Sequence, residues 1–204
     1  MRKPSDTAIA TAEAVFSEHG GVMCTREALE AGIHASTLYW MGDHGLLEAL
    51  SRGVFHLSST PLPESLEIAA VMRRAPKAVL CLVSALSYHE IGTQIPHAVQ
   101  IALPRKVRSP RFDYPPIEVF NMSDSALSVG VEEHDMGGTA VRVFSVAKTV
   151  ADCFKYRSKI GLDVAVEALQ ETVRKHMASP AQIMDAARVV RVESMTEPYL
   201  RALL

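Results

Sequence analysis

The chain has 204 residues, of which 48% are hydrophobic and 22% charged, and its formal net charge is −2 at pH 7. This balance is typical of a folded globular protein and excludes an intrinsically disordered chain, which would combine lower hydrophobicity with a larger charge imbalance. No run of about 18 uncharged apolar residues is present, and no long apolar run follows the basic residues of MRKPSDTAIA, so we expect a cytoplasmic protein without membrane contact. Three cysteines with no CxxC pair indicate reduced, buried thiols, so no disulfide framework, metal or cofactor is expected.

Charge is distributed unevenly along the chain. Residues 1–57 contain four basic and seven acidic residues. Residues 73–111 reverse this balance, with seven basic residues against Glu90 alone. The positive electrostatic field is therefore expected from the middle of the chain.

The first 57 residues predict three helices followed by a hairpin. Asp6 and Thr25 are candidate caps for the first two helices, and a third begins at Ser36 or its neighbour and ends at Gly45. LLEALSRGVFHL has two apolar segments around residues 51–53, which predicts a tight β-hairpin. This order predicts a winged helix-turn-helix over residues 1–57. A small helical bundle without a ligand is the alternative.

Residues 58–75 predict a linker and a connecting helix. SSTPLPES is rich in serine and proline, and a helix from Glu64 to about Arg74 follows it. The next segment, between Pro76 and Gly92, is almost uniformly apolar and predicts one buried helix.

The remaining chain predicts strands followed by helices. HAVQIALP, IEVFNM and ALSVGVEEHDMGGTAVRVFSV are β-rich, and the Gly137-Gly138 pair is a hairpin signal. Ser145 and Ser179 are candidate caps for two later helices, and Asp163 lies near the start of another. The sequence therefore predicts an α+β domain over residues 76–204, with a mixed or antiparallel sheet covered by helices.

Three segments carry a resemblance to a known family. They are CLVSALSYHEI at 81–91, AKTVADCF at 147–154 and GLDVAVEAL at 161–169. With the winged helix they resemble the AbiEi family of transcriptional regulators, the antitoxins of type IV toxin-antitoxin (abortive infection) systems. The resemblance covers nearly the whole chain. It implies a non-enzymatic protein that represses its own promoter by binding double-stranded DNA at inverted repeats. It also implies a C-terminal domain needed to neutralise a cognate nucleotidyltransferase-like toxin.

The predicted DNA-reading region is poor in cations. Members of the family often carry arginines in the third helix and before the wing, whereas this chain has LYWMGDHGLLEALSRGVF. Arg26 and Arg52 are the remaining candidates for phosphate contacts. Candidates for contacts to base edges are Ser36, Thr37, Tyr39 and Trp40. A homodimer would double the phosphate contacts over two half-sites.

A basic segment, LPRKVRSPRF, lies outside that region. Its cations are Arg105, Lys106, Arg108 and Arg111. Phosphate neutralisation supplies much of the affinity of DNA-binding proteins, so this loop is a candidate DNA contact. A docking surface for an acidic toxin and an ordinary solvated loop both remain open.

The candidate catalytic and metal-binding residues fit structural roles better than a site. A hydrolase triad would use Ser84 or Ser87 with His89 and Asp152, but neither serine lies in a glycine-flanked elbow. Cys81, His89 and Cys153 are too irregularly spaced for a zinc site. HDMGGTAV lacks the lysine of a phosphate-binding loop. Asp152, inside an apolar helix, is expected to accept hydrogen bonds from a neighbouring loop or an arginine.

Two functions follow from the sequence. The first is a DNA-binding regulator of the antitoxin type. The alternative is a protein-interaction module that does not bind DNA and whose winged helix mediates dimerisation or partner binding, since Tyr39 and Trp40 on an acidic helix suit an interface.

Overall fold

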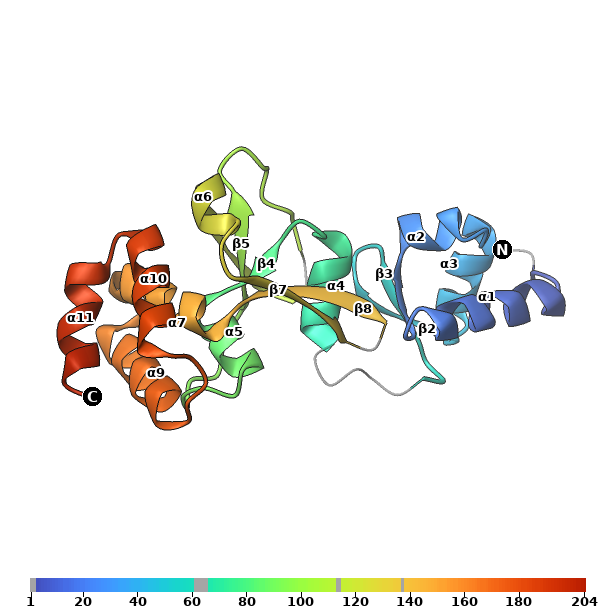
Figure 1. Ribbon diagram of the computed structural model, residues 1–204. Helices are drawn as coiled ribbons and strands as arrows, with labels where there is room; N and C mark the ends of the chain where they lie inside the picture. The colour runs from blue at the N-terminus through green and yellow to red at the C-terminus, as the bar shows by residue number, and fades with distance from the viewer. Residues whose placement is uncertain (1–2, 61–65, 113–114, 137) are drawn as a thin grey trace. The chain divides into compact units, whose positions relative to one another are not determined.

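The computed structural model describes residues 3–60, 66–112, 115–136 and 138–204 (Figure 1). The chain divides into two compact units. The first comprises residues 1–77, 110–116 and 134–141, and the second comprises residues 78–109, 117–133 and 142–204. Both units contain helices and strands, which confirms the predicted α+β class.

The first unit contains four helices and a three-stranded antiparallel sheet among its described residues. The elements in chain order are α1 (Asp6–Glu18), β1 (Val22–Cys24), α2 (Thr25–Glu30), α3 (Ala35–Asp43), β2 (Leu47–Ser51), β3 (Val54–Leu57) and α4 (Leu66–Arg74). The sheet order is β1-β3-β2, so the hairpin of β2 and β3 is extended by β1. The sequence did not predict β1, whose three residues are too few to show an alternating pattern.

Local sequence explains where these helices begin. Ser5 caps α1 by accepting a hydrogen bond from the Ala8 amide, so the cap lies one residue before the predicted Asp6. Cys24 occupies the cap position of α2 in place of the predicted Thr25, and its amide donates to the Glu27 carboxylate at 2.8 Å. The helix ends at Glu30, and Gly32, which follows the cap residue Ala31, has a φ of +88° that suits glycine.

Apolar side chains from helices and sheet form the core of the first unit. Its fully buried members include Phe16, Met23, Leu38 and Met41. Helix α4 packs on the three strands, where Ala70 joins Val22 and Val54 in a second small cluster.

The segment predicted as a linker and connecting helix does not form a separate connection in the structure. Its helix, α4, belongs to the first unit, and the boundary between the units follows Lys77. The helix begins at Leu66. The predicted start at Glu64 and most of the proline-containing linker lie outside the described residues.

The second unit is built on a five-stranded mixed sheet with the order β6-β5-β4-β8-β7. Strand β5 runs parallel to β6 and antiparallel to β4, and β4 runs parallel to β8. The strands are β4 (Val79–Leu80), β5 (Val99–Pro104), β6 (Ile117–Met122), β7 (Val131–Met136) and β8 (Thr139–Phe144). The ends of β7 and β8, within residues 134–141, belong to the first unit. Gly138 has a φ of +78°, as a hairpin glycine would, while Gly137 lies outside the described residues.

Helices α7, α9, α10 and α11 pack against one another (Figure 1), and together with α5 and the strands they enclose the main core of the unit. The helices are α5 (Leu82–Tyr88), α6 (Asp124–Leu127), α7 (Val146–Lys155), α8 (Arg157–Ile160), α9 (Leu162–Arg174), α10 (Pro180–Val190) and α11 (Glu193–Arg201). The predicted caps Ser145 and Ser179 are confirmed, and Gln182 completes the capping box of α10. Helix α11 was not predicted.

The prediction of one long helix between Pro76 and Gly92 is wrong. Val79 and Leu80 form strand β4, paired with Ala102 and Ile101 of β5. The chain then turns at Leu82, whose φ is +49°, into the short helix α5. A continuous apolar run has no periodicity that separates a buried strand from a buried helix, and so the sequence pattern could not reveal β4.

Candidate nucleic-acid interface

Helix α3 exposes two of the four side chains predicted to contact bases. Ser36 is exposed and bonded to His34 Nδ1 at 2.7 Å, and the Tyr39 side chain is 50% exposed. Tyr39 meets Phe55 edge-on, with ring centroids 6.2 Å apart. Residues three apart share one face of a helix, so Ser36 and Tyr39 define the outer face of α3.

The structure contradicts the prediction that Thr37 and Trp40 contact base edges, because both residues are buried. Thr37 is 5% exposed and Trp40 is 8% exposed. Trp40 packs in the core of the first unit and stacks on His44 with ring centroids 3.9 Å apart. Their positions on α3 face inward with Leu38 and Met41, which removes them from any surface that contacts bases.

The two predicted phosphate contacts of the first unit, Arg26 and Arg52, line one cavity of about 430 Å³. The Thr25 amide donates to the Gly53 carbonyl at 2.8 Å, which ties the start of α2 to the β2–β3 turn that carries Arg52. Arg74 of α4 lines the same cavity and donates to the Arg52 carbonyl at 2.8 Å. We call Arg26, Arg52 and Arg74 the arginine cluster.

The cluster remains available to an anion. Arg26 lies 3.8 Å from Glu30 in an ion pair whose side chains are 70% and 68% exposed, and such exposed pairs are weak. Arg52 is exposed and forms no ion pair within the described ranges. The Arg74 guanidinium lies 4.9 Å from the centre of the Phe112 ring, which supports it without neutralising its charge. Three cations around one cavity suit a phosphate-bearing ligand.

Sequence reasoning missed Arg74 as a site residue. In the sequence, Arg74 stands in the basic stretch of residues 73–111, at the end of the predicted connecting helix. The pair Arg73-Arg74 at the end of a helix was the available signal. Their separate roles depend on how α4 packs, which the sequence did not reveal.

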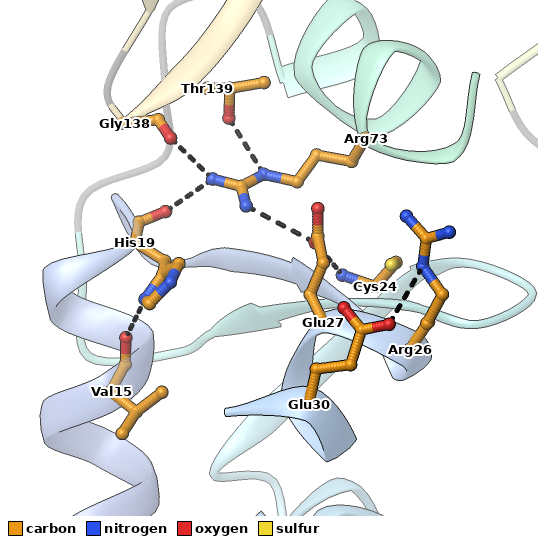
Figure 2. A network of polar contacts seen from close by, with 9 residues as sticks. All are labelled: Val15, His19, Cys24, Arg26, Glu27, Glu30, Arg73, Gly138 and Thr139. Carbon is orange, nitrogen blue, oxygen red and sulfur yellow. Dashed lines mark hydrogen bonds and ion pairs between the residues drawn. The ribbon is translucent and has the colours of Figure 1, made fainter. Parts of the chain in front are cut away.

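Arg73, beside this cluster, is buried in a polar network (Figure 2). Its guanidinium donates to the His19 carbonyl at 2.8 Å, the Gly138 carbonyl at 2.7 Å and the Thr139 hydroxyl at 3.1 Å. It also pairs with the Glu27 carboxylate at 3.3 Å. The network fixes α2 and the end of the β7–β8 hairpin against α4 within the first unit, so Arg73 has a structural role.

A glycine permits this close arrangement. A Cβ at Gly138 would lie 2.9 Å from the backbone nitrogen of Gly20, closer than real Cβ contacts. Any larger residue at position 138 would therefore push two backbones apart.

The predicted basic loop is divided between the units. Arg105, Lys106 and Arg108 are exposed after β5 in the second unit. Arg111 is exposed in the first unit. Neither unit by itself holds all four cations.

Ser84 and His89, two residues of the hydrolase-triad hypothesis, have other partners. The Ser84 hydroxyl accepts from the Gln100 amide at 2.9 Å and donates to the Ala98 carbonyl at 3.3 Å. His89 Nε2 bonds to the Phe144 carbonyl at 2.7 Å. These contacts hold α5 to the sheet and form no Ser-His-Asp arrangement. No group of three or more His, Cys, Asp or Glu side chains in the described residues could hold a metal ion.

Asp152 pairs with Lys148, one turn earlier on α7, at 2.5 Å. The sequence predicts a neighbouring loop or an arginine as the partner of Asp152, whereas the structure shows a lysine of the same helix. Both side chains are 1% exposed, and the Lys148 ammonium also lies 4.0 Å from the centre of the Phe144 ring. Burial raises the pKa of the Asp152 carboxyl, and Lys148 offsets part of this rise. Burial also raises the pKa values of the Cys81 and Cys153 thiols.

Fold and surface together define an α+β protein with an arginine cluster on its first unit. No helix of the described residues is long and apolar enough to cross a membrane.

Neither a family model nor a curated protein matches the chain. Among solved structures, the chain is similar to the crystal structure of the RV2827C protein from Mycobacterium tuberculosis, with a TM-score of 0.59 and 14% sequence identity. The match covers 98% of this chain and 82% of that chain. At this identity the likeness shows a shared fold and nothing about activity.

Proposed function

We propose that the protein is a DNA-binding transcriptional regulator whose first unit is a winged helix-turn-helix. The order of three helices and a hairpin supports this proposal, with α2 and α3 joined through Gly32 and with Arg52 and Gly53 at the tip of the wing. The observation that carries the proposal is the arginine cluster, in which Arg26 of α2, Arg52 of the wing and Arg74 of α4 line a single cavity.

In this mechanism, α3 docks in the major groove and the arginine cluster binds phosphates. Ser36 and Tyr39 contact base edges, since a hydroxyl can hydrogen-bond to any base and an aromatic edge can meet a thymine methyl group. Three neutralised phosphates per subunit correspond to a log–log salt slope of about −2.7 from the cluster alone. Because the acidic side chains Asp43 and Glu48 are also exposed in this unit, we expect low affinity for a single half-site. A homodimer on inverted repeats would double the contacts.

The resemblance to the AbiEi family extends this proposal. We propose that the protein represses its own promoter and that its second unit neutralises a nucleotidyltransferase-like toxin. The segments that carry the resemblance form α5, α7 and the first part of α9, which pack together in the core of the second unit. They support a shared architecture, and the toxin-contacting surface must lie on other residues.

A mobility-shift assay on the DNA upstream of the protein's own gene tests DNA binding. The protein should retard this fragment at low salt and less at moderate salt, and Arg52→Gln should weaken the shift at both. The matched control is Arg201→Gln, which removes an exposed, ion-paired arginine outside the cluster. Absence of any shift at either salt concentration, or equal effects of the two substitutions, would contradict the proposal.

A second candidate function is a protein-interaction module that does not bind DNA. The observation favouring it is the exposure of two large apolar side chains on neighbouring helices of the first unit, Leu29 at 45% and Tyr39 at 50%. Aromatic and apolar side chains in such positions are enriched at interfaces. Co-purification with the product of the adjacent gene, combined with no DNA shift, would select this function.

A further inference from the structure

The second unit contains a polar cavity of about 360 Å³, which the proposed function does not use. It is formed by the end of β6, the segment around α6, the last turn of α7 and the end of α10. This volume lies within the range of about 300–1,000 Å³ that is usual for small-molecule sites. The cavity is therefore large enough for one small ligand.

Three cations surround this cavity: Arg105, Lys155 and Arg191. All three are exposed, and none forms an ion pair within the described part of the chain. Hydroxyl groups from Ser123, Ser125 and Tyr156 also line the cavity, and the Tyr156 ring is held edge-on against Phe120. Cations with nearby hydroxyls are the donors that bind phosphate groups.

Arg191 is held in an uncommon backbone conformation. It lies directly after α10 with φ +62° and ψ +47°, the left-handed region in which glycine or asparagine normally ends a helix. An arginine there is strained, and strain of this kind concentrates at ligand sites, where the side chain is needed in one place. The conformation fixes the point at which the Arg191 side chain leaves the end of α10.

A buried carboxylate provides a second observation. Asp152 also lines the cavity, and its Oδ2 atom pairs with Lys148. Its other oxygen, Oδ1, is buried and has no hydrogen-bond partner. A buried carboxylate oxygen without a donor is unfavourable, so a ligand that offers an N–H or O–H group would satisfy it.

We propose that this cavity binds a nucleotide. The phosphates contact Arg105, Lys155 and Arg191, and an N–H or O–H group of the base or ribose donates toward Asp152 Oδ1. Tyr156 and the apolar side chain of Val189 provide the walls against which the base or sugar packs. A nucleotide can contact the cations and Asp152 with different groups, whereas a single phosphate would have to contact both.

Isothermal titration calorimetry with ADP, GDP, UDP and inorganic pyrophosphate tests the proposal. At least one nucleoside diphosphate should bind saturably to the full-length chain, and more tightly than pyrophosphate. Loss of one charged contact should weaken that binding by about tenfold or more. We therefore expect this loss for both Arg191→Gly and Lys155→Gln.

Arg191→Gly separates ligand binding from folding. Glycine adopts a positive φ without strain, so this variant should melt at or above the temperature of the wild-type chain. Arg201→Gln is the charge-matched control outside the cavity, and it should bind the nucleotide as the wild-type chain does. Three results would overturn the proposal: no saturable binding of any nucleotide, pyrophosphate binding as tight as nucleotide binding, or unchanged affinity in both cavity variants.

Discussion

Replacing Arg73 by methionine removes the polar network of the first unit while keeping most of the aliphatic volume. The Arg73 side chain is 6% exposed and donates to four acceptors, of which Glu27 carries a charge. Removing one partner of a fully buried ion pair costs about 3–5 kcal/mol. Glu27 is 26% exposed and keeps the Cys24 amide as a donor, so leaving its carboxylate without Arg73 costs less than it would in a fully buried pair. Adding the hydrogen bonds lost at the three uncharged acceptors, we expect Arg73→Met to lower the free energy of unfolding by about 3 kcal/mol.

Urea unfolding followed by tryptophan fluorescence measures this change. The single tryptophan, Trp40, lies in the core of the first unit and reports on that unit. For a chain of this size, about 3 kcal/mol corresponds to a fall in melting temperature of about 6–12 °C. Hydrogen exchange should also become faster at residues 138–141. The adjacent control, Arg74→Met, removes one exposed hydrogen bond and should change stability by less than about 1 kcal/mol. An Arg73→Met protein within about 0.5 kcal/mol of wild type would refute the structural role of the network.

Three further predictions concern the core and the second unit. Trp40→Ala should lower the free energy of unfolding of the first unit by about 3–5 kcal/mol, because the ring fills the core. A circular dichroism melt measures this change, and an unchanged melting temperature would contradict the burial of Trp40. Lys148→Met should lower the free energy of unfolding by about 3–5 kcal/mol, because it leaves the buried Asp152 carboxylate without its partner. In a double-mutant cycle, adding Asp152→Leu should recover most of this loss. A double variant that is no more stable than Lys148→Met would contradict the pairing. Lys175 and the Gly92 amide lower the pKa of Glu171 below its ordinary 4.5, so the stability from this carboxylate is present above pH 4.5 and is lost as the pH falls below it. Urea unfolding of Glu171→Gln should therefore show a weaker loss of stability in acid than wild type, and identical pH profiles would exclude this role.

Sequence patterns predicted the helices that begin with a capping side chain. Ser145 and Ser179 cap their helices because a serine hydroxyl satisfies a free amide in the first turn, which depends only on nearby residues. Strand β4 could not be predicted in this way. Val79 and Leu80 are strand residues because β5 and β8 lie on either side of them, and those partners come from distant parts of the chain.

The candidate site was predictable only for those residues that local sequence identifies. Arg26 and Arg52 were identified from their place in the predicted winged helix, and both line one cavity. Thr37 and Trp40 were assigned to the surface because a short helix with few charges does not show which face is buried. Arg74 entered the cluster only through the packing of α4, which no local pattern encodes.

The central proposal, that the arginine cluster binds DNA phosphates, is tested most directly by the salt dependence of binding. Fluorescence anisotropy on the protein's own upstream DNA gives the dissociation constant from about 50 to 200 mM salt, a range in which phosphate contacts strongly change affinity. The triple variant Arg26→Gln, Arg52→Gln, Arg74→Gln should bind more weakly than wild type. Its log–log slope should be shallower by about 2.7 per bound subunit. A wild-type chain that does not bind this DNA at the lowest salt, or a triple variant with the wild-type slope, would contradict the account.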